Sequence, residues 1–338
     1  MSSEMTTPQL SESARAKQAA AADLAMLSTK PRSLWQDGWY RLLRNKAAVA
    51  GMFIITFFML VAIFASVLAP HNPLKIYSGK SFLPAAWVQQ PSGKNGDPNF
   101  PLGTDTIGRD VLSRTIYGAR VSMVVGFIPT LIIVLVGTVI GLAAGYYGGW
   151  IDNLLMRFTD IMYAFPDLLF FIIIMVSLRD SFIGQFLNGM FLLFAALALV
   201  NWVGEARVVR GQVLSLKEKE FVEAARCIGA RDSTIMFRHI LPNALGPVII
   251  ITAMTIPGMI ITEAALGYLG LGLRPSTDPN ALFITSWGAS LLEGQTAINS
   301  QPWLLLAPAI CVALVVLAFT FLGDGLRDAF DPRMKGTS

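Results

Sequence analysis

The sequence has little charge, little cysteine and little histidine. Only 14% of its 338 residues are charged, whereas soluble domains carry about 25%. Two cysteines cannot build a disulfide framework, and two histidines exclude a His-rich metal site. A net charge of +4, without a basic run interleaved with aromatic residues, excludes a nucleic-acid partner. Because 54% of the chain is hydrophobic, most of it is expected to face lipid.

Six segments are apolar and long enough to cross a bilayer. A helix needs about 20 apolar residues to do so, because its backbone must satisfy its own hydrogen bonds in the hydrocarbon. The segments are 47–69, 121–144, 161–178, 181–204, 240–262 and 303–323. The first begins too far from the start for a signal peptide, which makes it an uncleaved anchor behind a polar tail. We therefore expect an all-α integral membrane protein with six transmembrane helices.

The distribution of Lys and Arg predicts the orientation of these helices. Seven basic residues precede the first segment and seven lie in 205–239, but 263–302 holds only Arg274. Cytoplasmic loops carry the excess of basic residues. Both termini and the 205–239 connection are therefore expected to be cytoplasmic, although the first outer loop, 70–120, also holds six basic residues.

No nucleotide-binding motif stands in the sequence. The tripeptide Gly79-Lys80-Ser81 lacks the earlier glycine of a P-loop, because position 74 is Leu. It also falls in the predicted outer loop, where it is interpreted as a solvated turn. We expect no catalytic residue in this chain, and any ATP that drives it would be hydrolysed by a separate subunit.

Ion coupling is the main alternative, because acids within a membrane usually mark a proton or ion pathway. Asp160 and Asp167, near the start of the third segment, are candidates, and Glu263 after the fifth is a weaker one. The same acids could instead lie at the membrane boundary, where a helix N-terminus favours them. An ion-coupled secondary transporter of small solutes and a six-helix channel therefore stay open as alternatives. Six spans are few for a lone secondary transporter, and no inverted pair of broken helices is evident.

The connection between the fourth and fifth segments has a helical pattern. An apolar stripe follows the spacing i, i+3, i+4 and i+7 and consists of Phe221, Ala224, Ala225 and Ile228. Gly229 is placed to end this helix, and Asp232 or Ser233 to cap the next one, which runs toward Ile240. Pro242 marks the entry into the fifth segment. The pattern predicts two short helices joined by a sharp turn. By itself it also fits an amphipathic helix on the membrane surface.

These residues resemble the EAA loop of permease subunits of binding-protein-dependent ABC importers. The resemblance rests on Glu223-Ala224-Ala225, Gly229 and Leu241-Pro242, and it departs at His239, where the pattern has Ile. Four further stretches are similar to the C-type permeases of the dipeptide/oligopeptide branch (DppC/OppC type): PLGTDTIGRDVLSRTIYGARVS (101–122), GYYGGWIDNLLMRFTD (145–160), EAALGYLGLGL (263–273) and LGDGLRDAFDPR (322–333). The similarity covers about 35–333, except around 75–100.

The resemblance implies a type I ABC importer permease fold. Residues 1–33 would form a mobile cytoplasmic tail, and 34–118 a transmembrane helix with an outer loop. Residues 119–330 would form the permease core of five transmembrane helices, with the coupling loop at about 205–242, and 331–338 a C-terminal tail.

The resemblance also implies a function. The chain would form the pathway for dipeptides or oligopeptides by alternating access, in the inner or plasma membrane. Its partners would be a homologous B-type permease, two ATPases of D and F type, and an extracytoplasmic solute-binding protein. ATP and Mg²⁺ would sit on the ATPases, with no cofactor on this chain. In the coupling loop, Glu223 would orient the loop at the ATPase surface and Gly229 would supply the turn. Substrate-contacting residues are not predicted, and a nickel chelate or oligosaccharide remains an alternative solute.

Three other patterns give local expectations. Gly137, Gly141 and Gly145 make a smooth face for close helix packing, against a helix of this chain or of a second permease. The charged residues of the first outer loop predict a solvated ion-pair cluster; they are Asp105, Arg109, Asp110 and Arg114. The long connection 267–302 is expected to form short helices at the outer mouth.

Overall fold

The computed structural model describes residues 34–89, 94–274, 276–278 and 281–330. Over these ranges the chain is helical, with one isolated bridge between Thr104 and Asp110 and no strand. The tails expected at 1–33 and 331–338 lie outside the described residues. The predicted all-α class is confirmed.

Five described helices are apolar and long enough to cross a membrane with their flanking turns. They are α3 (Lys46–Ile63), α5 (Val111–Tyr147), α9 (Met190–Leu216), α12 (Leu241–Tyr268) and α14 (Trp303–Phe330). A sixth crossing is available only if α6 (Gly149–Tyr163) and α7 (Asp167–Leu178), which are bent by 79° at their junction, act as one span.

The prediction of a single helix over 161–178 is therefore wrong. The break falls at Pro166, which precedes α7 with an extended backbone. Proline has no N–H to donate and disfavours helical geometry in the residue before it, so α6 ends at Tyr163 and the chain restarts in a new direction.

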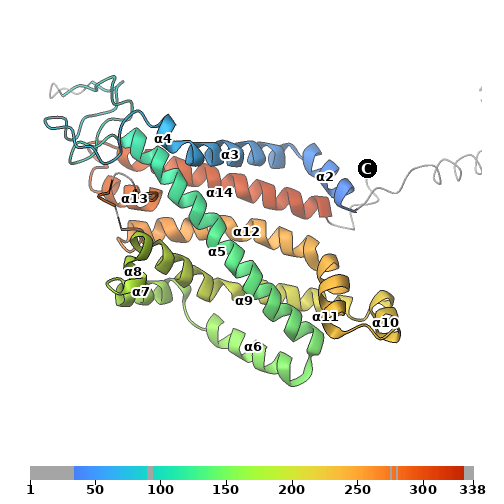
Figure 1. Ribbon diagram of the computed structural model, residues 1–338. Helices are drawn as coiled ribbons and strands as arrows, with labels where there is room; N and C mark the ends of the chain where they lie inside the picture. The colour runs from blue at the N-terminus through green and yellow to red at the C-terminus, as the bar shows by residue number, and fades with distance from the viewer. Residues whose placement is uncertain (1–33, 90–93, 275, 279–280, 331–338) are drawn as a thin grey trace, which may run out of the picture.

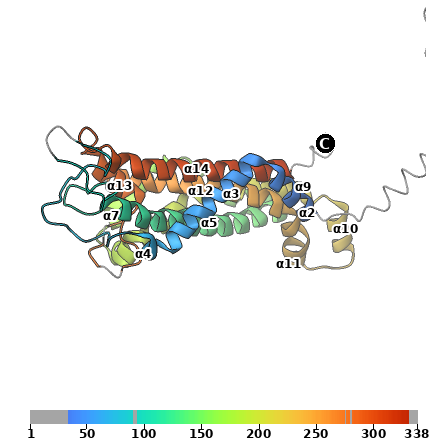
Figure 2. The same ribbon diagram turned by 90° about the horizontal axis from the view of Figure 1, so that it is seen from above.

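The helices run along a common long axis (Figures 1 and 2). In Figure 1, α3 and α14 lie side by side, α12 follows, and α5 crosses in front of the bundle, with α9 and α6 on the far side from α3. Residues 70–89 and 94–110, which belong to the loop predicted above as the first outer loop and are still called the outer loop, gather with α13 (Trp287–Gln295) at one end, called here the loop end. The opposite end, with α2 (Leu34–Arg44), α10 (Glu220–Cys227) and α11 (Asp232–Thr234), is called the hairpin end.

Four helices, α5, α9, α12 and α14, extend beyond their uncharged segments. Helix α5 begins at Val111, with the Asp110 carboxylate accepting from the Ser113 N–H as N-cap. This start lies inside the range 34–118 that was assigned to the first helix and outer loop. Helix α9 continues past Glu205 to Leu216, so the connection expected to begin at residue 205 begins at Lys217.

The three glycines of α5 pack against α9 of the same chain. A Cβ on Gly137 would lie 2.5 Å from the Glu205 Cβ, one on Gly141 2.6 Å from the Ala206 carbonyl oxygen, and one on Gly145 2.7 Å from the Val213 Cβ. The expected packing role is confirmed, and the choice left open from sequence is decided in favour of a helix within this chain.

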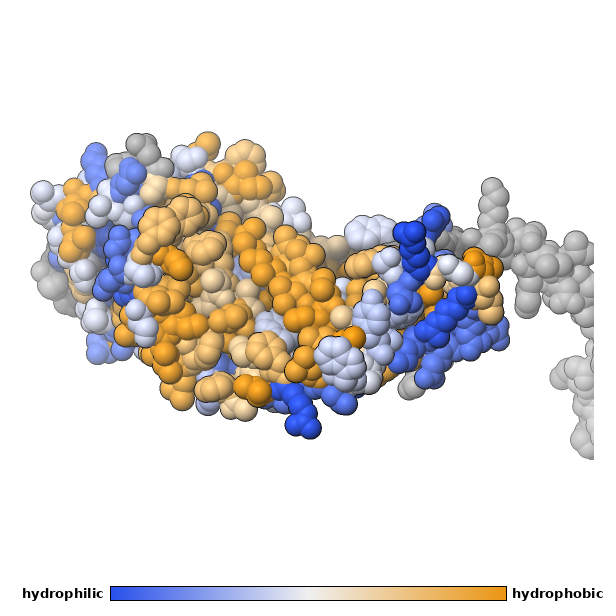
Figure 3. All heavy atoms as spheres, turned by 60° about the horizontal axis from the view of Figure 1, so that its bottom comes forward, coloured by the Kyte–Doolittle hydropathy of each residue, from blue (hydrophilic) through white to orange (hydrophobic). Residues whose placement is uncertain are grey.

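The surface between the two ends is apolar. Figure 3 shows a broad hydrophobic area over the middle of the molecule and hydrophilic side chains at both ends. At the loop end, the expected short helix within 267–302 is α13, which is anchored by the fully buried Trp287. Its indole N–H donates to the Thr115 carbonyl at 2.9 Å.

Candidate functional site

The residues that resemble the EAA loop form a helical hairpin at the hairpin end (Figure 1). Helix α10 (Glu220–Cys227) is followed by a turn, by α11 (Asp232–Thr234), and by one π-helical turn (Ile235–Ile240) that leads directly into α12. Figure 2 shows α10 and α11 projecting beyond the ends of the long helices. The two short helices predicted from the sequence are confirmed.

Gly229 makes the turn, as its position predicts. Its φ of 76° lies in the left-handed region, which side chains other than glycine rarely adopt. The Gly229 N–H donates to the Arg226 carbonyl at 2.9 Å and the Ala230 N–H to the Ala225 carbonyl at 3.1 Å. These bonds close the C-terminus of α10 in the manner of a glycine C-cap.

The cap predicted for the second helix is wrong. Arg231 occupies the N-cap position, and no side chain caps α11. The Asp232 carboxylate instead accepts a hydrogen bond from the Tyr146 hydroxyl, on the last turn of α5, with 2.7 Å between the two oxygens. The carboxylate is thus used to fix the hairpin to the bundle rather than to end a helix.

One face of the hairpin is packed into the bundle. Its buried side chains are Val222, Ala225, Ile235, Met236 and Ile240, and they contact Leu142 and Tyr146 of α5, Val209 and Val213 of α9, and Val248 of α12. We call this group of ten residues the hairpin seat. Because three long helices contribute to it, displacement of the hairpin is transmitted to all three.

The other face of α10 is exposed. Of the predicted apolar stripe only Ala225 is buried, whereas Phe221 is 39% and Ile228 84% exposed. Glu223 and Ala224 are exposed as well, and Glu223 has no ion-pair partner among the described residues. The stripe therefore faces outward, with a free carboxylate beside it.

The remaining EAA positions stand where the hairpin joins the bundle. Leu241 is half-buried and Pro242 exposed, both on the first turn of α12. Pro242 has no N–H to donate, and it directly follows the π-helical turn and Leu241, where the helical hydrogen-bond pattern changes.

Polar contacts tie the hairpin and α6 to the long helices. The Lys217 ammonium donates to the Gly145 carbonyl at 3.0 Å, and the Arg226 guanidinium lies 5.7 Å from the Tyr146 ring centroid. Arg210 of α9 forms a bidentate pair with Asp152 of α6, with both N–O distances at 2.6 Å. Sequence reasoning missed these contacts, although Asp152 lies in one of the recognised stretches.

Two of the three acids proposed for ion coupling, Asp160 and Asp167, are on the surface. Asp160 pairs with Arg207 at 2.8 Å, and both side chains are exposed. Asp167 is exposed at the first turn of α7, where a helix N-terminus favours an acid. Neither forms part of a buried relay among the described residues.

Two carboxylates are buried where the sequence placed loop boundaries. Glu263 is fully buried in α12 and accepts from the Ser122 hydroxyl at 3.2 Å. Glu205 is 2% exposed in α9, and neither of its carboxylate oxygens has a hydrogen-bond partner in the described part of the chain. The sequence analysis placed both glutamates at the ends of apolar segments because they are charged.

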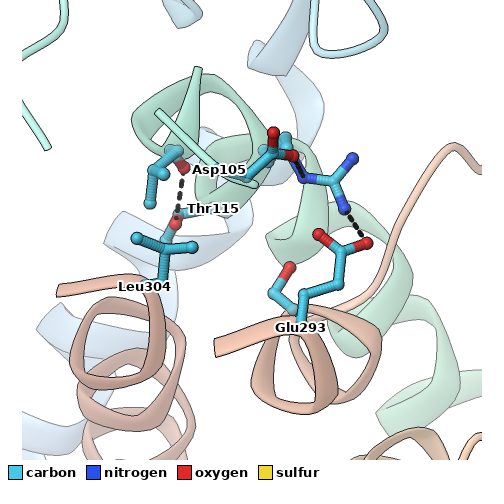
Figure 4. A pocket seen from close by; sticks show the side chains of 7 residues that line it. Asp105, Thr115, Glu293 and Leu304 are labelled. Atoms are coloured by element: carbon cyan, nitrogen blue, oxygen red, sulfur yellow. Dashed lines mark hydrogen bonds and ion pairs between the residues drawn. The ribbon is translucent and has the colours of Figure 1, made fainter. Parts of the chain in front are cut away.

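The loop end holds a buried ion-pair cluster (Figure 4). The guanidinium of Arg114 lies 2.7 Å from the Glu293 carboxylate and 3.6 Å from that of Asp105. Arg109 pairs with Asp105 at 2.6 Å and with Glu293 at 3.1 Å. Ion pairing was predicted correctly, but solvation was not, because Asp105 and Arg114 are only 2% and 3% exposed.

Glu293 of α13, far along the chain, completes this cluster. It supplies the second carboxylate that both arginines pair with, so the charges can be buried. Asp110 does not share these pairs: it caps α5 and lies 3.5 Å from the His71 imidazole. The described residues contain no group of three potential metal ligands.

Comparison with known proteins gives two family matches. The model described as "Binding-protein-dependent transport system inner membrane component" matches residues 137–336. The "N-terminal TM domain of oligopeptide transport permease C" matches residues 33–85.

The chain is also similar to curated permeases. It is 41% identical to an oligopeptide transport system permease protein OppC of Haemophilus influenzae, over 89% of each chain. It is 38% identical to the OppC of Bacillus subtilis, over 93% of this chain and 95% of that one. It is 40% identical to a dipeptide transport system permease protein DppC of Alkalihalophilus pseudofirmus, over 90% of this chain and 91% of that one.

A chain of the MetNI methionine ABC transporter, solved in inward-facing conformations, aligns with a TM-score of 0.48 and 17% identity, over 64% of this chain and 96% of that one. The family model covers more than half of the sequence, and the curated permeases match it over about nine-tenths of its length. The chain belongs to the family of binding-protein-dependent transport system inner membrane components.

Proposed function

We propose that this chain is the C-type permease subunit of an ATP-driven importer of dipeptides or oligopeptides. The relatives with this role are 38–41% identical, and the alignments cover nearly the whole of both chains. The separate match to the N-terminal domain of oligopeptide permease C supports the assignment to the C-type subunit. The type I importer fold is part of the same proposal.

The proposed complex contains a second, B-type permease, two ATPases and an extracytoplasmic solute-binding protein. The family description names a binding protein, and the excess of Lys and Arg around the hairpin favours the cytoplasmic side for it. Both termini would then be cytoplasmic, and the loop end would face the binding protein. ATP and Mg²⁺ would be held by the ATPases, because the sequence has no P-loop.

The observation that supports coupling most directly is the two-sided hairpin. Its inner face is fixed in the hairpin seat, and its outer face presents Phe221, Ile228 and the unpaired Glu223. An exposed apolar stripe on a helix is suited to lie in a groove of another protein. A carboxylate at its edge would pair with a basic side chain of the ATPase and set the register of docking.

Alternating access follows from this arrangement. Closure of the ATPases would displace the hairpin, and the seat would pass the displacement to α5, α9 and α12. Because three glycines leave no room for a side chain between α5 and α9, the two helices pack closely and would move together. Rotation of this pair would open the pathway to one side and close it to the other.

A substitution at Gly229 tests the coupling role. Valine is a β-branched residue and strongly disfavours the left-handed backbone that this position adopts, so Gly229→Val would distort the turn between α10 and α11. In proteoliposomes with the complete importer, we expect loss of labelled dipeptide uptake and of peptide-stimulated ATP hydrolysis, with normal membrane insertion.

Gly211→Val is the matched control. Gly211 is exposed in α9, and a Cβ there meets no atom within 4 Å, so uptake should remain. Wild-type uptake by the Gly229→Val importer would refute the coupling role. The substrate class is tested separately on the wild-type complex: transport of a labelled oligosaccharide or nickel chelate, with none of di- or tripeptides, would refute the peptide assignment while leaving the coupling intact.

A further inference from the structure

A large apolar cavity lies between α3 and α5 toward the loop end. Its volume is about 410 Å³, within the range of about 300–1,000 Å³ that is typical of ligand pockets. Met59 and Ile63 of α3 and Val124 and Ile128 of α5 form its two walls, and Phe283 closes one side. Both walls belong to helices that are apolar enough to cross a membrane, so an occupant from the bilayer can reach it.

One lining residue is charged. Arg120 donates from Nε to the Ala62 carbonyl at 3.1 Å, and its guanidinium lies 5.4 Å from the Tyr117 ring centroid. No carboxylate of the described residues forms an ion pair with it. By contrast, Arg114, two turns earlier on the same helix, pairs with Glu293.

Arg120 stands directly before the uncharged segment 121–144, where a membrane-spanning segment is expected to meet the lipid headgroups. Its hydrogen bond reaches the last turn of α3, which ends at Ile63. Basic side chains near the ends of transmembrane helices extend toward the interface, where phosphate groups lie. An unpaired cation in apolar surroundings is costly without a counter-charge, and a phosphate at this depth would supply one.

We propose that this groove is a binding site for an anionic phospholipid, with one acyl chain in the cavity between α3 and α5 and the phosphate on the Arg120 guanidinium. The cavity accommodates the apolar part and the arginine selects the charge. The proposal depends on the chain being embedded in a membrane, but not on peptide transport.

The test uses the assembled importer in detergent and native mass spectrometry of its lipid-bound forms. The probes are dioleoyl phosphatidylglycerol, which is anionic, and dioleoyl phosphatidylcholine, which is zwitterionic. A juxtamembrane basic residue strengthens binding of an anionic lipid by about fivefold, so Arg120→Gln should lower phosphatidylglycerol binding by that factor. Val124→Trp should reduce binding of both lipids by filling the cavity.

Two substitutions serve as controls. Arg157→Gln removes an exposed arginine of α6 outside the groove, and Leu135→Trp adds the same indole at an exposed position of α5 that does not line it. Both should bind phosphatidylglycerol like the wild type. Arg120→Lys keeps the charge and should retain most of the preference, which keeps the test valid if Val124→Trp fails to assemble.

Three results would overturn the proposal. The first is unchanged phosphatidylglycerol binding by Arg120→Gln. The second is full competition by sn-glycerol 3-phosphate, which carries the anion without acyl chains and would indicate a plain anion site. The third is a crosslink from Ile128→Cys to the second permease in the intact complex, which would show that a protein helix covers the groove.

Discussion

Removal of Arg114 should loosen the outer loop without unfolding the helix bundle. In the Arg114→Met variant the guanidinium between Glu293, at 2.7 Å, and Asp105, at 3.6 Å, is lost. Breaking a buried ion pair costs about 3–5 kcal/mol. Arg109 still pairs with both acids and Glu293 is partly exposed, which lowers the expected cost to about 2–3 kcal/mol.

This loss of free energy should shift the local opening equilibrium of the loop toward the open state. At about tenfold per 1.4 kcal/mol, the opening equilibrium of the loop would rise by about 30- to 150-fold. Amide hydrogen exchange of 94–110, followed by mass spectrometry on the assembled importer, measures this change directly. Exchange at the middle of α5 and α9 should stay at the wild-type rate.

Two comparisons make the test specific. Arg157→Met removes an exposed arginine with no ion-pair partner among the described residues and should leave the exchange of 94–110 unchanged. A double-mutant cycle with Glu293→Gln should give a coupling energy of about 0.5–3 kcal/mol, as for residues in one network. Wild-type exchange in Arg114→Met, or purely additive effects in the cycle, would refute the assignment of this cluster as the tie between outer loop and α13.

Two further predictions concern the hairpin and the outer loop. Tyr146→Phe removes the hydroxyl that donates to Asp232, which should weaken the attachment of the hairpin to α5 by about 1–2 kcal/mol. The importer should then hydrolyse more ATP per peptide transported, whereas Tyr147→Phe should match the wild type. An unchanged ratio of ATP hydrolysed to peptide transported in Tyr146→Phe would contradict this attachment. The pKa of Asp97 lies below its ordinary 3.8, because the Lys80 ammonium hydrogen-bonds its carboxylate at 2.5 Å. The carboxylate therefore stabilises the loop above pH 3.8 and loses this effect as the pH falls through the lowered value. Protease cleavage near Asp97 should rise in that acidic window, and Asp97→Asn should remove this dependence; equal pH profiles would contradict it.

The hairpin could be predicted from sequence because its signals are local. A glycine after an apolar helical stripe is sufficient to place the turn, and Gly229 adopts the left-handed conformation that the pattern requires. The bend before α7 also has a local signal, Pro166, but the run of apolar residues on both sides outweighed it. A hydrophobic run indicates whether a segment is long enough to cross a bilayer, but it does not indicate whether the helix changes direction within that run.

The lengths of α5 and α9 could not be predicted in the same way. A hydropathy pattern breaks a segment at each charged side chain. It therefore began the second segment after Arg120 and ended the fourth before Glu205, whereas α5 begins at Val111 and α9 runs to Leu216. In the fold, Arg114 meets Glu293 and Arg210 meets Asp152, so both arginines are accommodated inside helices. Such partners lie far apart in the chain, and only the tertiary structure brings them together.

The continuity of α5 has a mechanical consequence. Its 37 residues form one uninterrupted helix, about 55 Å long at 1.5 Å per residue, with the Arg114 cluster near its first turn and the Tyr146–Asp232 bond at its last. Pro129 stands inside this helix, where it removes one backbone hydrogen bond, and contacts to other elements hold both helix ends. Displacement of the hairpin and displacement of the loop end would therefore both act on α5.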